Sequence, residues 1–224
     1  MDRKIIVTQD NSKTLLISEL NETYHSTNGA YNEAIHVFIN AGIQFFPKKE
    51  NLKIFEMGFG TGLNALLSSN YALNNQLQIN YTSIEKYPLD MELVQELNYP
   101  QLIDNKEAES LFTLLHSSSW GKENKINPHF TLNKLKEDLA SFNLDMNSFD
   151  IVFYDAFGPR VQPDLWTIES LRKMYELLVP GGILVTYCAQ GQFKRNLKSL
   201  GFLVENLPGP PGKREMTRAI KPKP

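Results

Sequence analysis

The stretch that decides the fold is Glu56-Met57-Gly58-Phe59-Gly60-Thr61-Gly62. It begins at the end of the short apolar run of residues 52–57 and precedes a helix-forming run at residues 63–73. Glycines in a strand-to-helix turn let the backbone bend tightly and approach a ligand, and the free N–H groups of the helix point at that ligand. The turn therefore predicts a ligand site of the nucleotide-binding type in an α/β domain.

The spacing of the glycines narrows the kind of ligand. They fall as G-x-G-x-G, whereas the dinucleotide fingerprint is G-x-G-x-x-G, so an NAD-dependent oxidoreductase is disfavoured. Together with the preceding Glu56, the pattern resembles the first motif of the class I S-adenosylmethionine-dependent methyltransferases. That resemblance implies that the acidic residue helps to bind the amino-acid part of the donor, and it implies cofactor contacts for Gly58, Gly60 and Gly62. A tight turn without a ligand is the alternative.

The rest of the chain alternates β-rich and helical runs. Seven segments are expected to be strands: residues 52–57, 78–85, 130–135, 149–155, 183–187, 202–205 and 217–220. Repeated β-α units favour a mostly parallel sheet with helices on both faces. We predict an α/β, Rossmann-like fold of the class I methyltransferase type with a seven-stranded sheet over residues 49–224. Residues 1–48 are expected to form an N-terminal hairpin and helix extension, and residues 179–182 a turn.

Composition excludes several other classes of protein. The formal net charge of −2 gives no bulk attraction for a polyanion, so any nucleic-acid contact must come from a local patch. A single cysteine, Cys188, excludes a disulfide framework and a cysteine-cluster zinc site; the four histidines are dispersed, and we predict no metal. With no apolar run near eighteen residues and no signal-peptide core, we expect a cytoplasmic protein without membrane contact.

Carboxylates end or follow the first four predicted strands. They are Glu56, Glu85, Asp138 and Asp155. Because ligands of open α/β sheets bind beyond the carboxyl ends of the strands, we expect the four to share one site. Glu85 has the spacing of a partner for two ribose hydroxyls, and Asp138, or the adjacent Glu137, is placed to accept from an adenine amino group. Each alone is typical of a solvated loop acid, but four in corresponding positions favour a positively charged ligand over a phosphate.

The segment Asp155-Ala156-Phe157-Gly158-Pro159 follows the fourth predicted strand. It puts a carboxylate, an aromatic ring and a rigid turn where the methyl group of a bound donor would lie. Methyl transfer to nitrogen needs a deprotonated amine held in line with the methyl–sulfur bond. Asp155 is the candidate to orient that amine and receive its proton, directly or through water. Phe157 and Trp166 are candidates to stack on a base, with core packing as the equal alternative.

Motifs along nearly the whole chain resemble one family of tRNA-modifying methyltransferases. They are Tyr24-His25-Ser26-x-x-Gly29-Ala30-x-x-Glu33, Gly58-Phe59-Gly60-Thr61-Gly62-Leu63-Asn64, Asp155-Ala156-Phe157-x-Pro159 and Gly212-Lys213-Arg214-Glu215-Met216. The chain resembles the methyltransferase that completes 5-methylaminomethyl-2-thiouridine at the tRNA wobble position, which is the N-terminal domain of MnmC proteins and their MnmD-like counterparts.

This resemblance implies a cofactor, a substrate and site residues. The cofactor is S-adenosyl-L-methionine, and the substrate is 5-aminomethyl-2-thiouridine in tRNA. The resemblance also implies cofactor roles for the glycines of the turn and for Glu56, Glu85 and Asp138, and a role in the site for Asp155. It adds Asn64 and Tyr24 to the residues that line the pocket. Because the sequence stops at Pro224, where the bifunctional family members continue into an FAD-dependent half, we expect an upstream enzyme to supply the aminomethyl-uridine.

The C-terminal stretch is locally positive. Lys213 and Arg214 stand out because the proline- and glycine-rich residues 208–212 hold them on a constrained loop. We predict that they contact tRNA phosphates, ordinary solvated charge being the alternative. Three other functions stay open at this point: aminopropyl transfer to a polyamine, methylation of a small amine, and a non-catalytic S-adenosylmethionine-binding module.

Overall fold

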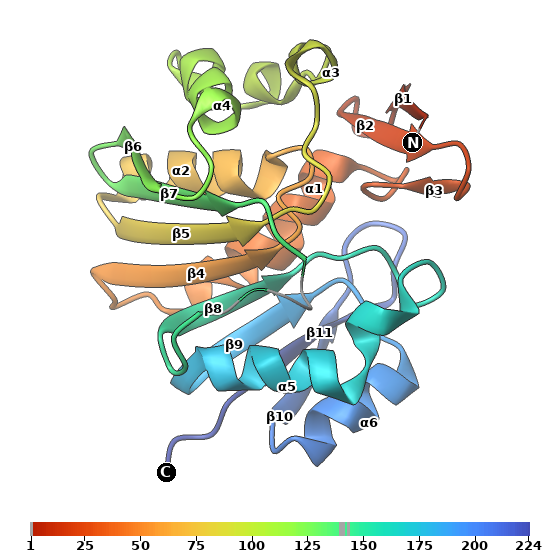
Figure 1. The fold of residues 1–224 in the computed structure, drawn as a ribbon, viewed down its shortest axis with the longest axis vertical. Helices are drawn as coiled ribbons and strands as arrows, with labels where there is room; N and C mark the ends of the chain where they lie inside the picture. Colours follow the sequence, from red (N-terminus) through yellow and green to blue (C-terminus); the bar gives the residue numbers. More distant parts are fainter. Residues whose placement is uncertain (1, 139–141, 143) are drawn as a thin grey trace.

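The computed structural model describes residues 2–138, 142 and 144–224, and its centre is one mixed sheet with helices on both faces (Figure 1). The strand order is β10-β11-β9-β8-β4-β5-β7-β6. This arrangement confirms the predicted Rossmann-like α/β fold. The strands are β4 (Asn51–Met57), β5 (Gln78–Ile84), β6 (Glu123–Asn127), β7 (Phe130–Leu135), β8 (Phe149–Tyr154), β9 (Leu178–Thr186), β10 (Leu203–Pro208) and β11 (Glu215–Ile220).

The direction of strand order reverses between β4 and β8. From β4 the parallel sheet continues to β5 and β7, and from β8 it continues the other way to β9. Ligands of open α/β sheets bind at such a switch point, beyond the carboxyl ends of the strands. The loops that leave β4 and β8 lie close together there. If Gly58 carried a Cβ atom, that atom would lie only 3.4 Å from the main-chain oxygen of Asp155.

Strand alternation sends side chains into two separate cores. Ile54 and Phe153 pack with α2 and α4 on one face, while Phe55 and Val152 pack with α5 and α6 on the other. Residues two positions apart share a face, so Glu56 and Asp155 project toward the α2 side. The α-helices are α1 (Ala30–Ala34), α2 (Leu63–Asn75), α3 (Met91–Gln95), α4 (Ala108–Ser117), α5 (Ile168–Leu177) and α6 (Gly191–Ser199).

The N-terminal extension is a small sheet followed by irregular helix. Its antiparallel strands are β1 (Arg3–Val7), β2 (Lys13–Ile17) and β3 (Glu22–Thr23). This small sheet lies beside the carboxyl ends of the parallel strands of the main sheet (Figure 1). After α1 the chain continues through a π-helical segment and a short 3₁₀ turn. The shorter helical turns are η1 (Ile35–Asn40), η2 (Ile43–Phe45), η3 (Tyr99–Leu102) and η4 (Pro163–Trp166).

Two local predictions were wrong. The main sheet has eight strands instead of seven, because β6 pairs antiparallel with β7. Its sequence, Glu-Asn-Lys-Ile-Asn, has no apolar alternation, and the pairing with its neighbour makes it a strand. Residues 179–182, predicted as a turn, lie within β9, where pairing with β8 is interrupted: the register moves from Phe149↔Leu178 directly to Ile151↔Ile183.

Within residues 2–138, 142 and 144–224, no helix has both the length and the apolar character that crossing a bilayer requires.

Candidate active site

A cavity of about 450 Å³ opens at the switch point, a size within the usual range for small-molecule sites. Its walls are the glycine turn, the loops after β5, β7 and β8, and part of the N-terminal sheet. The sequence-predicted residues that line it are Tyr24, Gly58, Gly60, Asn64, Glu85, Asp138, Asp155 and Phe157, and Glu137 lines it as well. Five other predicted site residues are not among the described residues that line the cavity: Glu56, Gly62, Trp166, Lys213 and Arg214.

The glycine turn has a backbone that only glycine adopts easily. The φ angles of Gly58, Gly60 and Gly62 are 93°, 50° and 73°. Three hydrogen bonds tie the turn to the end of β5: Gly58 N and Phe59 N each donate to Ile84 O at 3.1 Å, and Gly60 N donates to Glu85 Oε2 at 2.9 Å. The turn is therefore held in place before any ligand binds.

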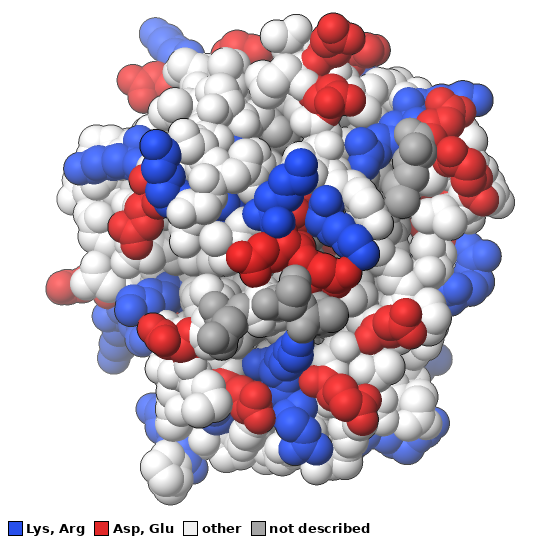
Figure 2. All heavy atoms as spheres, in the orientation of Figure 1, with Lys and Arg blue, Asp and Glu red and all other residues white. Residues whose placement is uncertain are grey.

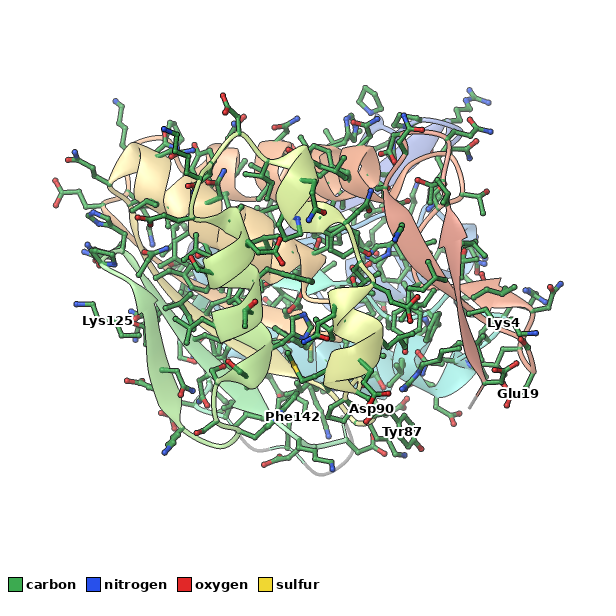
Figure 3. All side chains as sticks on the ribbon, turned by 90° about the horizontal axis from the view of Figure 1, so that it is seen from above. Lys4, Glu19, Tyr87, Asp90, Lys125 and Phe142 are labelled. Atoms are coloured by element: carbon green, nitrogen blue, oxygen red, sulfur yellow. The ribbon has the colours of Figure 1, made fainter. Side chains whose placement is uncertain are left out.

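The wall beyond β5 carries the predicted adenosine contacts. Besides the glycine turn, the Glu85 carboxylate accepts Tyr87 N at 2.7 Å. Asp138 forms an ion pair with Lys86, with Oδ2 and Nζ 2.7 Å apart. Arg3, from β1, donates from Nη2 to Tyr87 O at 2.9 Å and so joins the N-terminal sheet to this wall. Seen from above, Tyr87 lies at the edge near that sheet, while Lys125 of β6 lies at the far side (Figure 3).

Glu56 lies behind the cavity wall, inside β4. Its side chain is fully buried and accepts a hydrogen bond from Ser83 Oγ at 2.7 Å. Burial raises the pKa of Glu56 to about 8, which the Ser83 hydrogen bond opposes and the charge of nearby Asp155 reinforces. A neutral carboxyl group therefore sits under the cavity at physiological pH.

Asp155 is the carboxylate that faces the cavity directly after β8. Asn64 of α2 donates from Nδ2 to Asp155 Oδ2 at 2.8 Å. Protein atoms surround most of the carboxyl group, and this burial raises the pKa of Asp155 to about 7. Glu33 raises that pKa further, and the Asn64 hydrogen bond and the Lys213 charge oppose the increase. The pKa of this carboxyl group therefore lies much closer to neutral pH than that of an ordinary aspartate.

Three side chains hold the segment that follows Asp155. Tyr187 donates to Ala156 O at 2.8 Å, Trp166 Nε1 donates to Phe157 O at 2.8 Å, and Gln162 Oε1 accepts Phe157 N at 3.1 Å. Trp166 is only 5% exposed, so the structure gives it a supporting place in the core beneath the segment. We expect the segment to be rigid.

The N-terminal sheet closes over this segment from the other side. The Tyr24 ring meets the Phe157 ring edge to face, with centroids 5.1 Å apart. An ion pair between Glu22 Oε2 and Arg160 Nη2, at 2.7 Å, links β3 to the same loop. The aromatic pair leaves Phe157 in the cavity wall, where a planar ligand has a surface to contact.

The two basic residues predicted to bind tRNA differ sharply in their surroundings. The Lys213 side chain is 32% exposed, and its Nζ lies 2.5 Å from Glu33 Oε1. The Arg214 side chain is 95% exposed. On the face shown in Figure 2, Lys and Arg side chains are interspersed with Asp and Glu, so that face has no continuous basic surface.

Comparisons with known proteins agree with this geometry. A family model described as S-adenosyl-L-methionine-dependent methyltransferase matches residues 116–222. The crystal structure of MNMC2 from Aquifex aeolicus superimposes with a TM-score of 0.80 at 26% identity, covering 100% of this chain and 72% of that one. The bifunctional protein MnmC of Campylobacter hominis, named for tRNA 5-methylaminomethyl-2-thiouridine biosynthesis, is 29% identical over 199 residues, or 88% of this chain. The chain is an S-adenosyl-L-methionine-dependent methyltransferase that is similar to the methyltransferase part of MnmC proteins.

The methyltransferase spans only part of its curated relatives. It aligns with 29% of the Campylobacter hominis protein and with 59% of an uncharacterized protein of Methanocaldococcus jannaschii, to which it is 26% identical over 224 residues.

The cavity of this methyltransferase offers polar atoms that fit the family's methyl donor. Asn64 Oδ1 and Glu56 Oε1 are buried, and neither has a hydrogen-bond partner within the described part of the chain. Asn64 also lines the cavity, so its side-chain amide lies beside the space that a ligand would fill. Carboxylates in the wall suit a sulfonium cation and would repel a phosphate.

Sequence reasoning missed Tyr187 and Gln162, and gave Glu33 no role although it quoted the residue in a motif. Tyr187 directly follows β9, as Asp155 directly follows β8. Applying the strand-end rule to every polar side chain, and not only to carboxylates, would have found it. Gln162 has no such signal, because its position depends on how the loop folds back.

Proposed function

We propose that this methyltransferase converts 5-aminomethyl-2-thiouridine to 5-methylaminomethyl-2-thiouridine at the wobble position of tRNA. The observation that carries the proposal is Asp155, which faces the cavity at the switch point and has its pKa raised to about 7. A family relative named for the biosynthesis of this nucleoside supports the choice of acceptor.

The donor would lie along the wall formed by β4, β5 and β7. The Glu85 carboxylate would accept from the two ribose hydroxyls, and Asp138 or Glu137 from the adenine amino group. The Asn64 amide oxygen would accept from the ammonium of the methionine part, and the glycine turn would lie against it. Glu56 would lie behind the wall, without direct contact with the donor.

Asp155 would take the proton that the acceptor must lose. Bound S-adenosylmethionine supplies an electrophilic methyl group on a positively charged sulfur. The Asp155 carboxylate accepts a proton from the acceptor ammonium, and the freed nitrogen lone pair forms the new N–C bond. The carbon–sulfur bond breaks with its electron pair remaining on sulfur, which becomes a neutral thioether. Asn64 fixes the orientation of the carboxylate through its 2.8 Å hydrogen bond.

The acceptor side would hold the uridine against aromatic side chains in the cavity wall. Phe157 and Tyr24 are placed at the cavity wall to contact a base that has left the anticodon stack. Arg214, largely exposed, is the better candidate of the two basic residues for a phosphate contact.

Methyl-labelled S-adenosylmethionine, incubated with the protein and tRNA from cells lacking this gene, tests the proposal. We expect label in 5-methylaminomethyl-2-thiouridine after nucleoside analysis. Label in a different nucleoside would change the acceptor and keep the reaction. Cofactor binding without label in tRNA would remove tRNA as the substrate and direct the search to small amines. Activity with only the decarboxylated donor would indicate aminopropyl transfer.

A further inference from the structure

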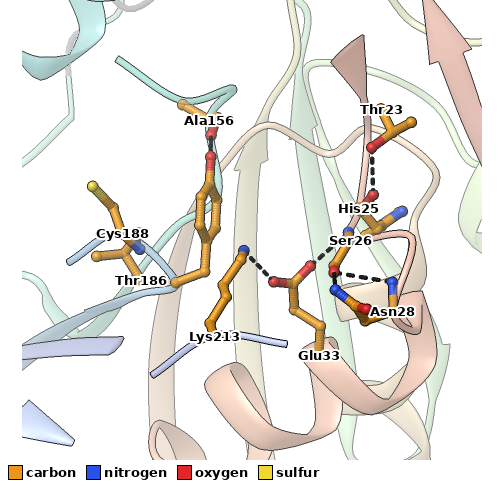
Figure 4. Close-up of polar contacts among 10 residues, drawn as sticks. Thr23, His25, Ser26, Asn28, Glu33, Ala156, Thr186, Cys188 and Lys213 are labelled. Atoms are coloured by element: carbon orange, nitrogen blue, oxygen red, sulfur yellow. Dashed lines mark hydrogen bonds and ion pairs between the residues drawn. The ribbon is translucent and has the colours of Figure 1, made fainter. Parts of the chain in front are cut away.

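Two charged residues that are far apart in the sequence meet behind the acceptor side of the cavity. Glu33 lies on α1, with its side chain 8% exposed, and its Oε1 lies 2.5 Å from Lys213 Nζ. The other carboxylate oxygen, Oε2, accepts Ser26 N at 2.8 Å (Figure 4). Both oxygens of this buried carboxylate are thus engaged, one by a cation and one by the backbone.

Lys213 also contacts the side chain that holds the Asp155 segment. Its Nζ lies 3.9 Å from the centroid of the Tyr187 ring. The hydroxyl at the far end of that ring donates to Ala156 O, the residue next to Asp155. A continuous set of contacts therefore runs from Glu33 through Lys213 and Tyr187 to the backbone beside the carboxylate that would accept the proton.

We propose that Glu33 and Lys213 form a positioning pair for Asp155, which holds Tyr187 against the Asp155 segment and sets the balance of charge around its carboxyl group. The catalytic meaning of this pair rests on the proposed function, but the pair itself is testable without an acceptor. It gives Lys213 a structural partner in place of the tRNA phosphate predicted from the sequence. Drawing Lys213 toward a phosphate would leave Glu33 buried without its cation, which is costly.

The two members of the pair act on Asp155 in opposite directions. The negative charge of Glu33 raises the pKa of Asp155, and the positive charge of Lys213 lowers it. Asp155 has other polar neighbours, and these must be held constant in any test. They are Glu56 of β4, Tyr81 of β5, Asn64 of α2 and Tyr187 after β9.

The direct test is the titration of the Asp155 carboxyl carbon by NMR in full-length protein labelled with ¹³C-aspartate, with Asp155→Asn assigning the signal. We expect a midpoint near 7 in the wild type. Glu33→Gln should lower it, and Lys213→Met should raise it, each by roughly half a pH unit or more. Lys213→Arg keeps the charge and should stay closest to the wild type. Arg214→Gln, the exposed neighbour, is the matched control and should leave the midpoint unchanged.

Unmoved midpoints in both Glu33→Gln and Lys213→Met would overturn the proposal, as would equal shifts in Lys213→Met and Arg214→Gln. Thermal melting identifies any variant that fails to fold. Lys213 is partly exposed, so Lys213→Met can decide alone if Glu33→Gln does not fold. In the methylation assay the acidic limb of the pH–rate profile should move with the same signs. A wild type that methylates no tRNA would refute the proposed acceptor while the NMR titration still decides on the pair.

Discussion

The proposed donor side and the proposed acceptor side of the cavity are built in different ways. The donor side is made of contiguous segments: the glycine turn between β4 and α2, and the loop that begins with Glu85 after β5. Main-chain hydrogen bonds hold it, such as Gly58 N to Ile84 O. The acceptor side gathers single side chains from distant segments, and aromatic contacts and a partly buried ion pair hold it. Its residues are Tyr24, Glu33, Asp155, Phe157, Tyr187 and Lys213.

This difference indicates which side can change. A donor site that depends on backbone geometry tolerates few changes, because positive φ angles and main-chain donors cannot be supplied by another side chain. An acceptor site assembled from side chains on loops and on a small added sheet can be altered one residue at a time. We therefore expect relatives of this fold to share the donor. We expect the acceptor to be decided by the N-terminal sheet, the loop after β8 and the loop between β10 and β11.

The largest expected effect is on the acceptor side, from Asp155→Ala. Loss of the proton acceptor should reduce the rate of methyl transfer by about 100-fold or more, the usual contribution of a general base. Affinity for S-adenosylmethionine, measured by calorimetry, should be largely unchanged. The matched control is Asp164→Ala, which removes another carboxylate from the same cavity wall and should keep most of the activity. Equal rates in the two variants would show that Asp155 takes no proton.

The next effect is on the donor side, from Glu85→Ala. This change removes the proposed ribose acceptor and the carboxylate that Gly60 N contacts. Hydrogen bonds to charged groups contribute about 1.5–3 kcal/mol, so affinity for S-adenosylmethionine should fall roughly 10- to 100-fold. Glu85→Gln keeps one oxygen acceptor and should lose less. If calorimetry gave the same affinity for Glu85→Ala as for the wild type, the ribose would have to lie elsewhere.

The smallest effect concerns Glu56, beneath the donor side, and appears as a pH dependence of stability. Its pKa is about 8 in the folded protein and ordinarily 4.5, so the folded state binds the extra proton between these values. Stability is then lost as pH rises from 4.5 through 8. Glu56→Gln, which mimics the neutral form, should match the wild type near pH 5 and melt a few degrees higher at pH 9.

The control for this prediction is Glu50→Gln, at an exposed glutamate just before β4, which should follow the wild-type melting curve at both pH values. A Glu56→Gln variant that melts below the wild type at pH 9 would mean that the ionised carboxylate stabilises the fold, and the sign of the prediction would be wrong.

Much of the donor side could be predicted because its signals are local. The glycine spacing, the strand before it and the helix after it occupy one short stretch, and a parallel sheet brings the ends of its strands to one edge. Glu85, Asp138 and Asp155 therefore reach one cavity as the sequence predicted. The same rule grouped Glu56 with them; in the structure its side chain is buried under α2, one residue before the end of β4, and does not line the cavity.

By itself, the sequence determined the Rossmann-like fold, the glycine turn between strand and helix, and the carboxylates at the strand ends, because spacing and periodicity are properties of neighbouring residues. Only the tertiary structure decided that β6 is a strand, that Trp166 supports the loop from the core, and that Lys213 pairs with Glu33 across 180 positions. Such contacts depend on sheet register and on how distant loops pack. A sequence pattern records which residues are close along the chain and not which are close in space.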